Sequence, residues 1–321
     1  MKDSYGRTID YLRISITDRC NLRCVYCMPA EGIPCIRHEE ILTYEEIQTI
    51  CEKMATLGLK HIKITGGEPL VRKECWNLIQ KLKSISSIET VTLTTNGILL
   101  AEMAEKLVQA GVDGVNISLD TLDVAEYSRI TRGGDVKKVL EGLKTILNYP
   151  QVTVKINCVL GGDGWEQTAI AIVELAKKYC VHVRFIECMP TDFKQLEQTK
   201  LQDRVREVLE SVYGPASDCE KPLGFGPSSY YQLEGFQGKI GFISAISHKF
   251  CENCNRLRLT ADGKLRLCLQ SSESIDLKSL LRQGRDSELM DAIQTAVYRK
   301  PKEHHFEDSE IETVGMSQIG G

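Results

Sequence analysis

Six of the 13 cysteines of this 321-residue chain form two groups of three. Their spacings are Cys20-x3-Cys24-x2-Cys27 and Cys251-x2-Cys254-x13-Cys268. Short spacings of this kind let thiolates from loops converge on one metal centre. A four-iron cluster normally takes four cysteine ligands, so a group of three would leave one iron open to a ligand from outside the protein. The two triplets therefore predict metal chemistry with an open coordination position.

Zinc is the alternative for these triplets, with His38 or His248 as the fourth ligand of a Cys3His site. The x3-x2 spacing disfavours zinc at the first triplet, whereas the second triplet leaves both metals open. The remaining cysteines stand singly, and several lie on apolar patterns, so we expect small buried hydrophobic residues. They are Cys35, Cys51, Cys75, Cys158, Cys180, Cys188 and Cys219.

Charge and hydropathy exclude several classes of protein. The 40 basic and 44 acidic residues leave a net charge of −4, so the surface as a whole does not attract nucleic acid or anionic membranes. No stretch approaches the roughly 18 apolar residues of a membrane span, and residues 1–10 lack the apolar segment of a signal peptide. We therefore expect a cytoplasmic protein without a nucleic-acid or membrane partner, whose clustered cysteines serve metal or redox chemistry.

The elements that must position the first triplet alternate between strands and helices. Each of six apolar, β-branched runs is followed by a helical pattern, which predicts a parallel sheet with helices outside, either an open doubly wound sheet or a partly closed barrel. The first triplet follows the first run directly, at the edge where such sheets place active sites. The runs are Tyr11–Ile16, His61–Thr65, Thr90–Thr95, Gly114–Leu119, Val152–Cys158 and His182–Ile186.

The first helix has the clearest signal, because Thr43 and Glu46 have the spacing of a capping box and Gly58 ends the apolar repeat that follows. Further helices are expected near 73–84, 100–110, 135–148, 165–179 and 199–212. We expect one domain over 1–213, and a linker over 214–229 because that segment is rich in Gly, Pro and Ser. A smaller α+β region is expected over 230–321. Its predicted strands are Tyr230–Leu233, Lys239–Ile243, Arg256–Thr260 and Leu265–Leu269, followed by helices near 276–283 and 286–299.

Five motifs carry a resemblance to a known family. The run from Cys20 to Cys27, followed by Met-Pro, and the later Thr65-Gly-Gly-Glu-Pro69 resemble the signature of the radical S-adenosylmethionine (SAM) enzymes. Tyr11-Leu-Arg-Ile-Ser-Ile-Thr-Asp-Arg-Cys20, Phe250-Cys-Glu-Asn-Cys-Asn-Arg-Leu-Arg-Leu-Thr-Ala-Asp-Gly-Lys264 and the terminal Gly320-Gly321 resemble the GTP 3′,8-cyclase family of molybdenum cofactor biosynthesis. The resemblance extends from about Tyr5 to Gly321.

The resemblance implies an α/β fold, a partial (β/α)6 TIM-type barrel whose open side is covered by the smaller α+β C-terminal region. It implies two [4Fe-4S] clusters, one at each end of the active-site channel. Cys20, Cys24 and Cys27 would hold the cluster that binds SAM, and Cys251, Cys254 and Cys268 would hold the cluster that binds guanine. The positions that match the SAM contacts are Tyr26, Gly67, Ser118 and Met189. Glycine at Gly66 and Gly67 suits the close approach of a ligand to the backbone.

Basic residues on predicted strands indicate an anionic ligand. Cations such as Arg13, Lys63 and Lys155 on a sheet buried on both faces are costly unless they meet an anion. Strand alternation places Arg256 and Arg258 on one face beside the second triplet, and guanidinium groups suit phosphate or a purine edge. The resemblance implies that GTP binds Arg13, Lys63, Thr94, Lys155, Arg256, Leu257 and Arg258.

The reaction implied by the resemblance begins with a 5′-deoxyadenosyl radical that abstracts the C3′ hydrogen of GTP. The C3′ radical attacks C8, and one-electron reduction gives (8S)-3′,8-cyclo-7,8-dihydroguanosine 5′-triphosphate. Gly320 and Gly321 would reach the active site as catalytic residues, because glycines thread a narrow channel without side-chain clash. The implied partners are GTP, an electron donor and cyclic pyranopterin monophosphate synthase as acceptor of the product, and a homodimer is compatible with the sequence.

Two rival hypotheses remain at this stage. Another radical SAM enzyme with an auxiliary cluster, acting on a peptide or RNA, would keep the first triplet but would not need Arg256, Arg258 or the terminal glycines. A non-catalytic zinc or nucleic-acid-binding module is the rival from another class. The net charge of −4 and the low count of 11 Tyr, 7 Phe and 2 Trp weigh against that module. The segments 161–166 and 191–229 look shorter or less regular than the resemblance leads us to expect.

Overall fold

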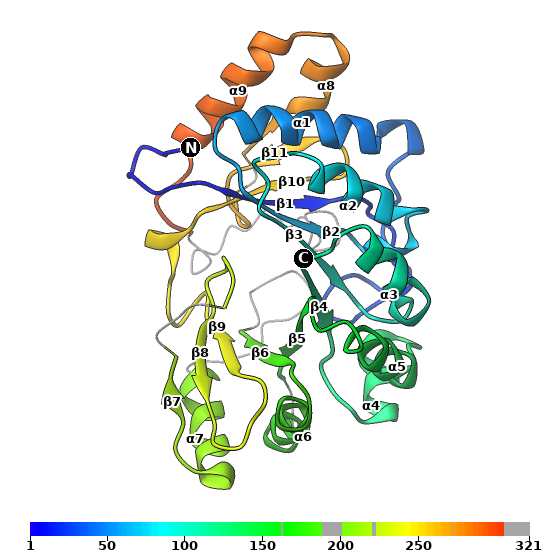
Figure 1. The fold of residues 1–321 in the computed structure, drawn as a ribbon, viewed down its shortest axis with the longest axis vertical. Coiled ribbons are helices and arrows are strands. Elements are labelled where there is room, and N and C mark those ends of the chain that lie inside the picture. Colours follow the sequence, from blue (N-terminus) through cyan, green and yellow to red (C-terminus); the bar gives the residue numbers. More distant parts are fainter. Residues whose placement is uncertain (162, 188–200, 220–222, 272, 305–321) are drawn as a thin grey trace.

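Eight strands run parallel to one another within a 12-stranded sheet in the part of the chain that the computed structural model describes, residues 1–161, 163–187, 201–219, 223–271 and 273–304 (Figure 1). All eight match predicted strands within one residue at either end, and six of them lie within residues 11–186. These six are β1 (Tyr11–Ser15), β2 (His61–Thr65), β3 (Thr90–Thr95), β4 (Gly114–Ser118), β5 (Thr153–Val159) and β6 (His182–Ile186). The predicted α/β fold with a partial barrel is confirmed.

The C-terminal third supplies the other two parallel strands, because β9 (Ile240–Ile243) pairs with β6 and β10 (Arg256–Leu259) pairs with β1. Antiparallel strands continue both ends of the sheet: β7 (Ser217–Asp218), β8 (Ser229–Gln232), β11 (Lys264–Arg266) and β12 (Ser274–Asp276). The C-terminal strands therefore do not form a sheet of their own but lengthen the barrel sheet at both edges (Figure 1). Strand β7 lies inside the segment 214–229 that we expect to be a linker, and the domain boundaries stay a prediction.

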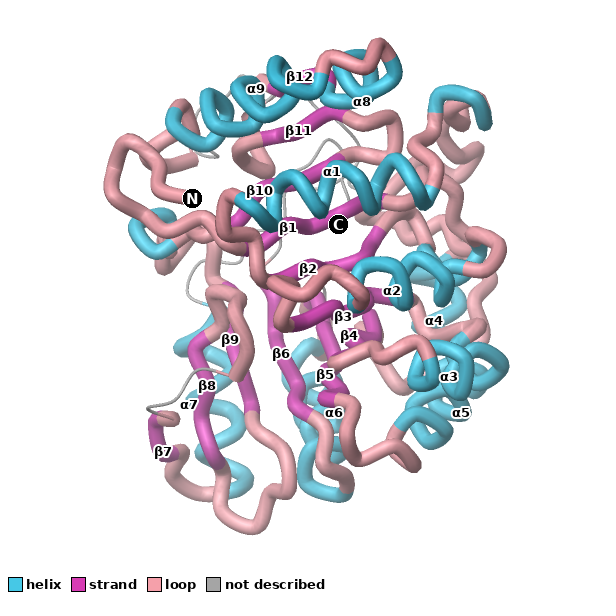
Figure 2. The backbone as a smooth tube through the Cα atoms, turned by 45° about the horizontal axis from the view of Figure 1, so that its top comes forward, coloured by secondary structure: helices cyan, strands magenta, loops and turns pink. Residues whose placement is uncertain are grey.

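Helices follow the parallel strands and lie on the outside of the sheet (Figure 2). The predicted capping box is present in the first of them, since the Thr43 side chain accepts from the Glu46 amide (3.1 Å) and the Glu46 carboxylate accepts from the Thr43 amide (2.8 Å). The helices are α1 (Tyr44–Thr56), α2 (Cys75–Lys83), α3 (Leu100–Gln109), α4 (Val124–Thr131), α5 (Val136–Ile146), α6 (Trp165–Lys178) and α7 (Leu201–Tyr213), with short 3-10 turns η1 (His38–Glu40), η2 (Pro69–Val71) and η3 (Cys251–Asn253). The sequence prediction missed α4, a helix of two turns that begins at the Asp123 cap.

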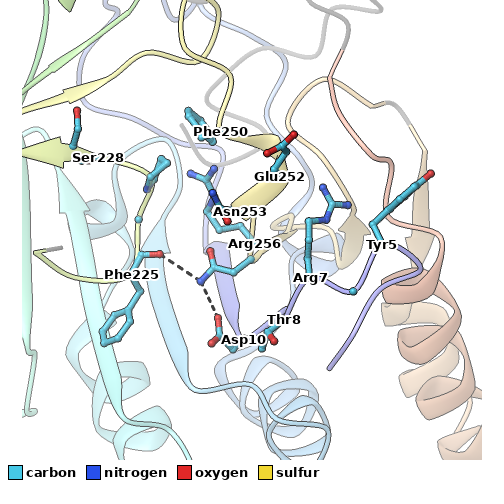
Figure 3. A pocket seen from close by; sticks show the side chains of 15 residues that line it. Tyr5, Arg7, Thr8, Asp10, Phe225, Ser228, Phe250, Glu252, Asn253 and Arg256 are labelled. Atoms are coloured by element: carbon cyan, nitrogen blue, oxygen red, sulfur yellow. Dashed lines mark hydrogen bonds between the residues drawn. The ribbon is translucent and has the colours of Figure 1, made fainter. Parts of the chain in front are cut away.

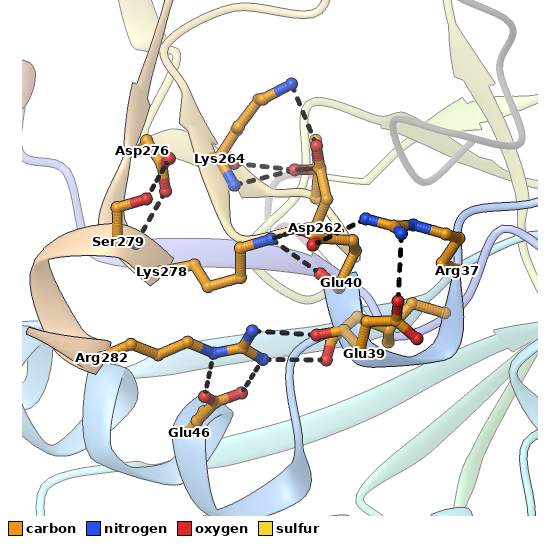
Figure 4. Close-up of polar contacts among 12 residues, drawn as sticks. Arg37, Glu39, Glu40, Glu46, Asp262, Lys264, Asp276, Lys278, Ser279 and Arg282 are labelled. Atoms are coloured by element: carbon orange, nitrogen blue, oxygen red, sulfur yellow. Dashed lines mark hydrogen bonds and ion pairs between the residues drawn. The ribbon is translucent and has the colours of Figure 1, made fainter.

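The last two helices, α8 (Leu277–Arg282) and α9 (Asp286–Tyr298), pack against the first helix. Figure 4 shows the polar contacts of α8. Arg282 donates to both carboxylate oxygens of Glu46 at 2.6 and 3.1 Å, and the Lys278 ammonium donates to the carboxylate and the backbone carbonyl of Glu40. Since Glu46 also caps α1, one side chain joins the start of α1 to the end of α8.

The two faces of the sheet differ in polarity. The helix-covered face is apolar: Leu12 and Ile14 of β1 and Val91 and Leu93 of β3 are fully buried in the hydrophobic core. The alternate residues of each strand face the opposite side, which we call the barrel interior. This alternation decides which side chains of the strands can meet a ligand.

The single cysteines divide into two kinds. Cys51, Cys75 and Cys158 are buried, as expected. The expectation is wrong for Cys35 and Cys180, which are exposed, because both lie in connecting segments rather than in the apolar pattern of an element. Cys219 is half-buried, and Cys188 lies outside the described residues. None of the described helices combines the length and the apolar character needed to cross a bilayer.

Candidate active site

The two cysteine triplets lie at opposite ends of the barrel. Strand β1 ends at Ser15, so the loop with the first triplet leaves the carboxyl end of the parallel strands. Strand β10 runs parallel to β1 and begins at Arg256, two residues after Cys254, so the second triplet lies at the amino end. Cys268 reaches the same end, because β11 runs antiparallel to β10 and ends two residues before it. The barrel interior therefore separates the triplets.

The first loop is fixed by backbone contacts to neighbouring elements. The amides of Arg23 and Val25 donate to carbonyls at the end of α4 (3.1 and 2.9 Å), which gives the missed helix a positioning role. The Arg132 guanidinium, just beyond α4, donates to the carbonyls of Arg23 and Met28. Asn96, after β3, donates to the sulfur of Cys20 at 3.9 Å. The end of α4 and the residue that follows β3 thus hold the loop that carries Cys20, Cys24 and Cys27.

Buried carboxyl groups surround this first triplet. Glu68 accepts from the Thr95 hydroxyl (2.7 Å) and the Asn96 amide (2.6 Å), and burial raises its pKa to about 7. Burial also raises the pKa of Asp120 to about 6. The pKa of the Cys24 thiol is raised by burial and then by Asp120 and the other two cysteines, which shows that the triplet's charges act on one another. The site disfavours further negative charge unless a cation or a metal compensates it.

The positions expected to contact SAM have different surroundings. The Tyr26 hydroxyl donates to Asp120 at 2.6 Å, and burial followed by Asp120 raises the pKa of Tyr26. A Cβ on Gly67 would lie 2.4 Å from the Arg19 carbonyl oxygen. The chain's own loop is therefore one reason for glycine at this position, and the expected contact of Gly67 with SAM stays a prediction. Ser118 is half-buried at the end of β4.

Cations line the barrel interior in register. Strand pairing places Arg13 of β1 between Arg258 of β10 and Lys63 of β2, and Arg258 in turn pairs with Arg266 of β11. Lys155 lies further round the barrel on β5, where its register partner on β4 is Asn116. Strands β1 to β6 and β9 to β11 contain no Asp or Glu.

Two lysines of this lining are buried. Lys63 and Lys155 are each 9% exposed, and Lys63 has no ion pair with any of the described residues. Burial, followed by repulsion from Arg184, lowers the pKa of Lys155 to about 7. Burial also lowers the pKa of Lys63 and brings that of Arg13 to about 10, with other cations adding to each shift. A bound polyanion would reverse these effects.

The sequence prediction missed Arg184 on β6, which is 7% exposed. Its Nη2 donates to the side-chain oxygens of Asn116 (2.9 Å) and Asn157 (2.5 Å), and Asn116 donates to the Thr94 hydroxyl at 3.4 Å. The Nε of Arg184 is buried and has no hydrogen-bond partner among the described residues. The rule applied to Lys63, that a cation on a buried strand needs an anion, would have found Arg184 as well.

The side chains of two residues expected to bind GTP have other partners in the structure. Leu257 is 1% exposed and belongs to the hydrophobic core, so its side chain points away from the barrel interior. The Lys155 ammonium donates to the backbone carbonyl of Leu223 and lies 5.6 Å from the centre of the Tyr230 ring. A ligand that binds Lys155 must therefore replace the Leu223 carbonyl or share the ammonium with it.

Basic groups surround the second triplet. The Arg256 guanidinium donates to the sulfur of Cys254 at 3.9 Å. Burial would raise the pKa of Cys254, but Arg256 and Lys300 outweigh it and bring the pKa to about 7. Cys254 and Cys268 both act electrostatically on Arg258. This triplet therefore favours negative charge.

A cavity of about 740 Å³ opens beside the second triplet (Figure 3). Phe250, Glu252, Asn253 and Arg256 line it from the cysteine-bearing segment, and Asp10 and Phe225 line it from the other side. Asn255 also lines the cavity, and its side-chain amide donates to the Asp10 carboxylate (2.8 Å) and to the Phe225 carbonyl (3.4 Å). The cavity volume is within the range of small-molecule pockets.

No three His, Cys, Asp or Glu side chains among the described residues lie together as a site for a single metal ion. Cysteines that hold a cluster at its corners bind different irons, so their sulfurs need not converge on one point. Of the expected site residues, Met189, Gly320 and Gly321 lie outside the described residues.

Comparison with known proteins identifies the family. Residues 14–197 match the model of the radical SAM superfamily, and residues 181–306 match that of Molybdenum Cofactor Synthesis C. A protein of Pelotomaculum thermopropionicum named GTP 3′,8-cyclase is 44% identical over 100% of both chains. This chain belongs to the GTP 3′,8-cyclase family. Members named so from Peptoclostridium acidaminophilum (45% identity, 99% of this chain, 98% of the relative) and Lactiplantibacillus plantarum (40%, 99% and 98%) also match at nearly full length.

Solved structures share the fold of this GTP 3′,8-cyclase family member. Streptococcus suis SuiB, determined with bound S-adenosylmethionine, superposes with a TM-score of 0.62 at 14% identity, over 90% of this chain and 66% of that chain. Methylornithine synthase superposes with a TM-score of 0.53 at 16% identity, over 91% and 87% of the two chains. At these identities the likeness concerns the fold alone.

Proposed function

We propose that this chain catalyses the radical SAM cyclisation of GTP to (8S)-3′,8-cyclo-7,8-dihydroguanosine 5′-triphosphate, an early step of molybdenum cofactor biosynthesis. The observation that carries the proposal is the row of cations in register, on strands without carboxylates, between two cysteine triplets. Full-length similarity to proteins named GTP 3′,8-cyclase supports it.

The first triplet suits a [4Fe-4S] cluster with one open iron. Without a metal, burial and mutual repulsion keep the pKa of Cys24 above its usual range, whereas coordination to iron stabilises the thiolate. When bound, the cluster and SAM supply a 5′-deoxyadenosyl radical. Asp120 and Glu68 provide acidic surroundings suited to the sulfonium and ammonium groups of SAM. Tyr26, Gly67 and Ser118 are the proposed SAM contacts in the described residues, and Met189 is a fourth proposed contact.

The second triplet suits a second [4Fe-4S] cluster, whose open iron would take the guanine base. Arg256 and Lys300 stabilise negative charge on Cys254, as ligation by thiolates requires. The adjacent cavity of about 740 Å³ provides room for a nucleotide at this end of the barrel.

The triphosphate would bind the cations of the barrel interior. Arg13, Lys63 and Arg258 lie on neighbouring strands in register, so that one extended anion can contact several of them. Arg184 is oriented by Asn116 and Asn157, and its buried Nε offers a further donor. Binding replaces the mutual repulsion of these cations by attraction to phosphate, and their burial excludes water from the contact. Thr94, Lys155, Arg256 and the backbone of Leu257 complete the proposed GTP contacts.

The remaining roles follow from the same proposal. Gly320 and Gly321 would reach the active site as catalytic residues at the end of the chain. An electron donor would reduce the first cluster, and cyclic pyranopterin monophosphate synthase would accept the product. A cytoplasmic location and a homodimer belong to this proposal as well.

GTP carrying deuterium at C3′ tests the reaction directly. Incubation with SAM and a reductant under anaerobic conditions is expected to yield 5′-deoxyadenosine that contains deuterium. 5′-Deoxyadenosine without the label would contradict the proposed hydrogen abstraction at C3′. Iron analysis tests the centres: about eight irons per chain are expected, and about four with zinc would contradict the second cluster.

A further inference from the structure

Lys300 is a buried cation that the proposed GTP site does not use. It lies two residues beyond the end of α9 and is 3% exposed. Its ammonium donates to the backbone carbonyl of Leu267 at 2.5 Å, and Leu267 precedes Cys268. The side chain is therefore held beside the second triplet rather than in solvent.

A buried lysine is usually paired with a carboxylate, but two of the charged neighbours of Lys300 are cysteines. Lys300 forms no ion pair with any residue in the described ranges. A buried ammonium with a single neutral acceptor is costly, because an isolated charge loses its hydration. The thiol groups of Cys254 and Cys268 lie close enough for their charges to act on Lys300. The sulfurs of the second triplet are thus anions within electrostatic reach of Lys300.

Arg7 fixes Lys300 to the same triplet through the backbone. Its guanidinium donates to the carbonyls of Cys251 (2.8 Å), Pro301 (2.6 Å) and Lys302 (2.7 Å). Asp3, whose side chain is fully buried, holds the Arg7 Nε at 2.6 Å and also accepts from the Arg7 amide. Arg7 therefore ties the segment that carries Lys300 to the segment that carries Cys251.

We propose that Lys300 is the buried counterion of a cluster held by Cys251, Cys254 and Cys268, and that Arg7 keeps it in place. Both are positioning residues, not catalytic ones. The inference rests on the proposed function, since it requires the second cluster. Nearby charge is one of the factors that set a cluster's reduction potential. A cation beside the cluster favours the reduced state, because reduction adds one negative charge.

The experiment measures the second cluster alone, in the full chain with Cys20, Cys24 and Cys27 replaced by serine. Anaerobic redox titration followed by electron paramagnetic resonance gives its midpoint potential in this parent and in two charge-removing variants. Lys300→Gln keeps a donor for the Leu267 carbonyl, whereas Lys300→Met removes it. Both are expected to lower the potential by at least about 59 mV, which corresponds to a tenfold change in the one-electron equilibrium.

Two further variants serve as controls. Lys300→Arg retains the charge and is expected to keep the potential of the parent. Lys278→Met removes a buried lysine that is paired with Glu40 in another part of the molecule. This variant is expected to leave the potential unchanged. Release of iron to a chelator is a second measurement, expected to be at least threefold faster in Lys300→Gln.

The outcomes separate the inference from the proposed function. If the parent loads about four irons and Lys300→Gln alters neither potential nor iron release, the counterion role is wrong and the second cluster stands. A parent that holds zinc or no metal overturns the second cluster and the inference with it. A loss of thermal stability in metal-free Lys300→Met, with an unchanged potential in Lys300→Gln, would show that Lys300 only anchors the Leu267 carbonyl.

Discussion

The two cysteine triplets have the same ligand set but opposite electrostatic surroundings. Glu68 and Asp120 are buried near the first triplet, where the pKa of Cys24 is raised. Arg256 and Lys300 accompany the second, where the pKa of Cys254 is lowered to about 7. Cysteine spacing alone therefore does not decide what an open iron binds. The acidic end suits a cationic ligand such as SAM, and the basic end suits an anionic nucleotide.

The largest expected effects come from removing one cysteine at each end. Cys24→Ser and Cys254→Ser are each expected to lose about four of about eight irons, because each breaks a different cluster. Cys24→Ser should abolish formation of 5′-deoxyadenosine, whereas Cys254→Ser should retain cleavage of SAM and lose the cyclised product. Iron analysis and chromatography of both products measure these effects.

Cys180→Ser is the matched control for these variants. Cys180 is an exposed single cysteine, and its replacement is expected to leave iron content and product formation unchanged. If Cys254→Ser still binds about eight irons, the second triplet does not hold a cluster of its own.

Glu68→Gln tests the acidic end through the pH dependence of stability. The pKa of Glu68 is about 7 in the folded protein against 4.5 ordinarily, so the folded state keeps a proton that the unfolded state releases. Its contribution to the unfolding free energy therefore falls as pH rises from about 4.5 to 7, by on the order of 3 kcal/mol. Relative to the parent, metal-free Glu68→Gln should gain stability over this range, as measured by urea unfolding.

Glu89→Gln provides the comparison, because Glu89 is an exposed carboxylate whose pKa is lowered by its hydrogen bond and charge interaction with Lys60. It should not reproduce the gain with rising pH. Parallel pH profiles for Glu68→Gln and the parent would mean that Glu68 ionises normally.

Lys63→Met tests the basic lining with two readouts of opposite sign. The affinity for GTP is expected to fall at least 30-fold, on the order of 2 kcal/mol, because a buried charge contact is lost. The thermal midpoint of the ligand-free protein is expected to rise, because Lys63 has no ion pair among the described residues. Calorimetric titration and thermal unfolding give the two values.

Lys60→Met, an exposed lysine paired with Glu89, should change neither value appreciably. A lower midpoint together with unchanged GTP affinity in Lys63→Met would show that Lys63 has a structural partner instead of a ligand.

The smallest expected effect is that of Arg184→Lys, which keeps the charge but loses the fork that binds Asn116 and Asn157. GTP affinity should fall about tenfold, on the order of 1.4 kcal/mol, with reductive cleavage of SAM retained. Equal affinity in Arg184→Lys and the parent would place Arg184 outside the nucleotide site.

The sequence predicted local features well and non-local ones less well. The six strands and the capping box at Thr43 depend on neighbouring residues, and all were found. The pairing of β10 with β1 depends on segments far apart in the chain, and no periodic pattern indicates it. For that reason the sequence predicts a separate C-terminal region over the open side of the barrel, whereas its strands extend the barrel sheet.

Individual site residues show the same difference between local and non-local features. Cys20 and Lys63 were recognisable from spacing and from a charge on an apolar strand. Arg184 carries that second signal but belongs to no motif, and it was missed. One reason for glycine at Gly67 required the structure, since only coordinates show that the Arg19 carbonyl occupies the place of a Cβ.

The parallel pairing of β1 with β10 also has a consequence for biosynthesis. Until the ribosome has made residues 256–259, one edge of β1 lacks its partner strand, and the row from Lys63 to Arg258 is incomplete. Unpaired strand edges favour aggregation, and contacts between distant segments form slowly. The nascent chain therefore contains the first cysteine loop well before β10 can complete this edge of the barrel sheet.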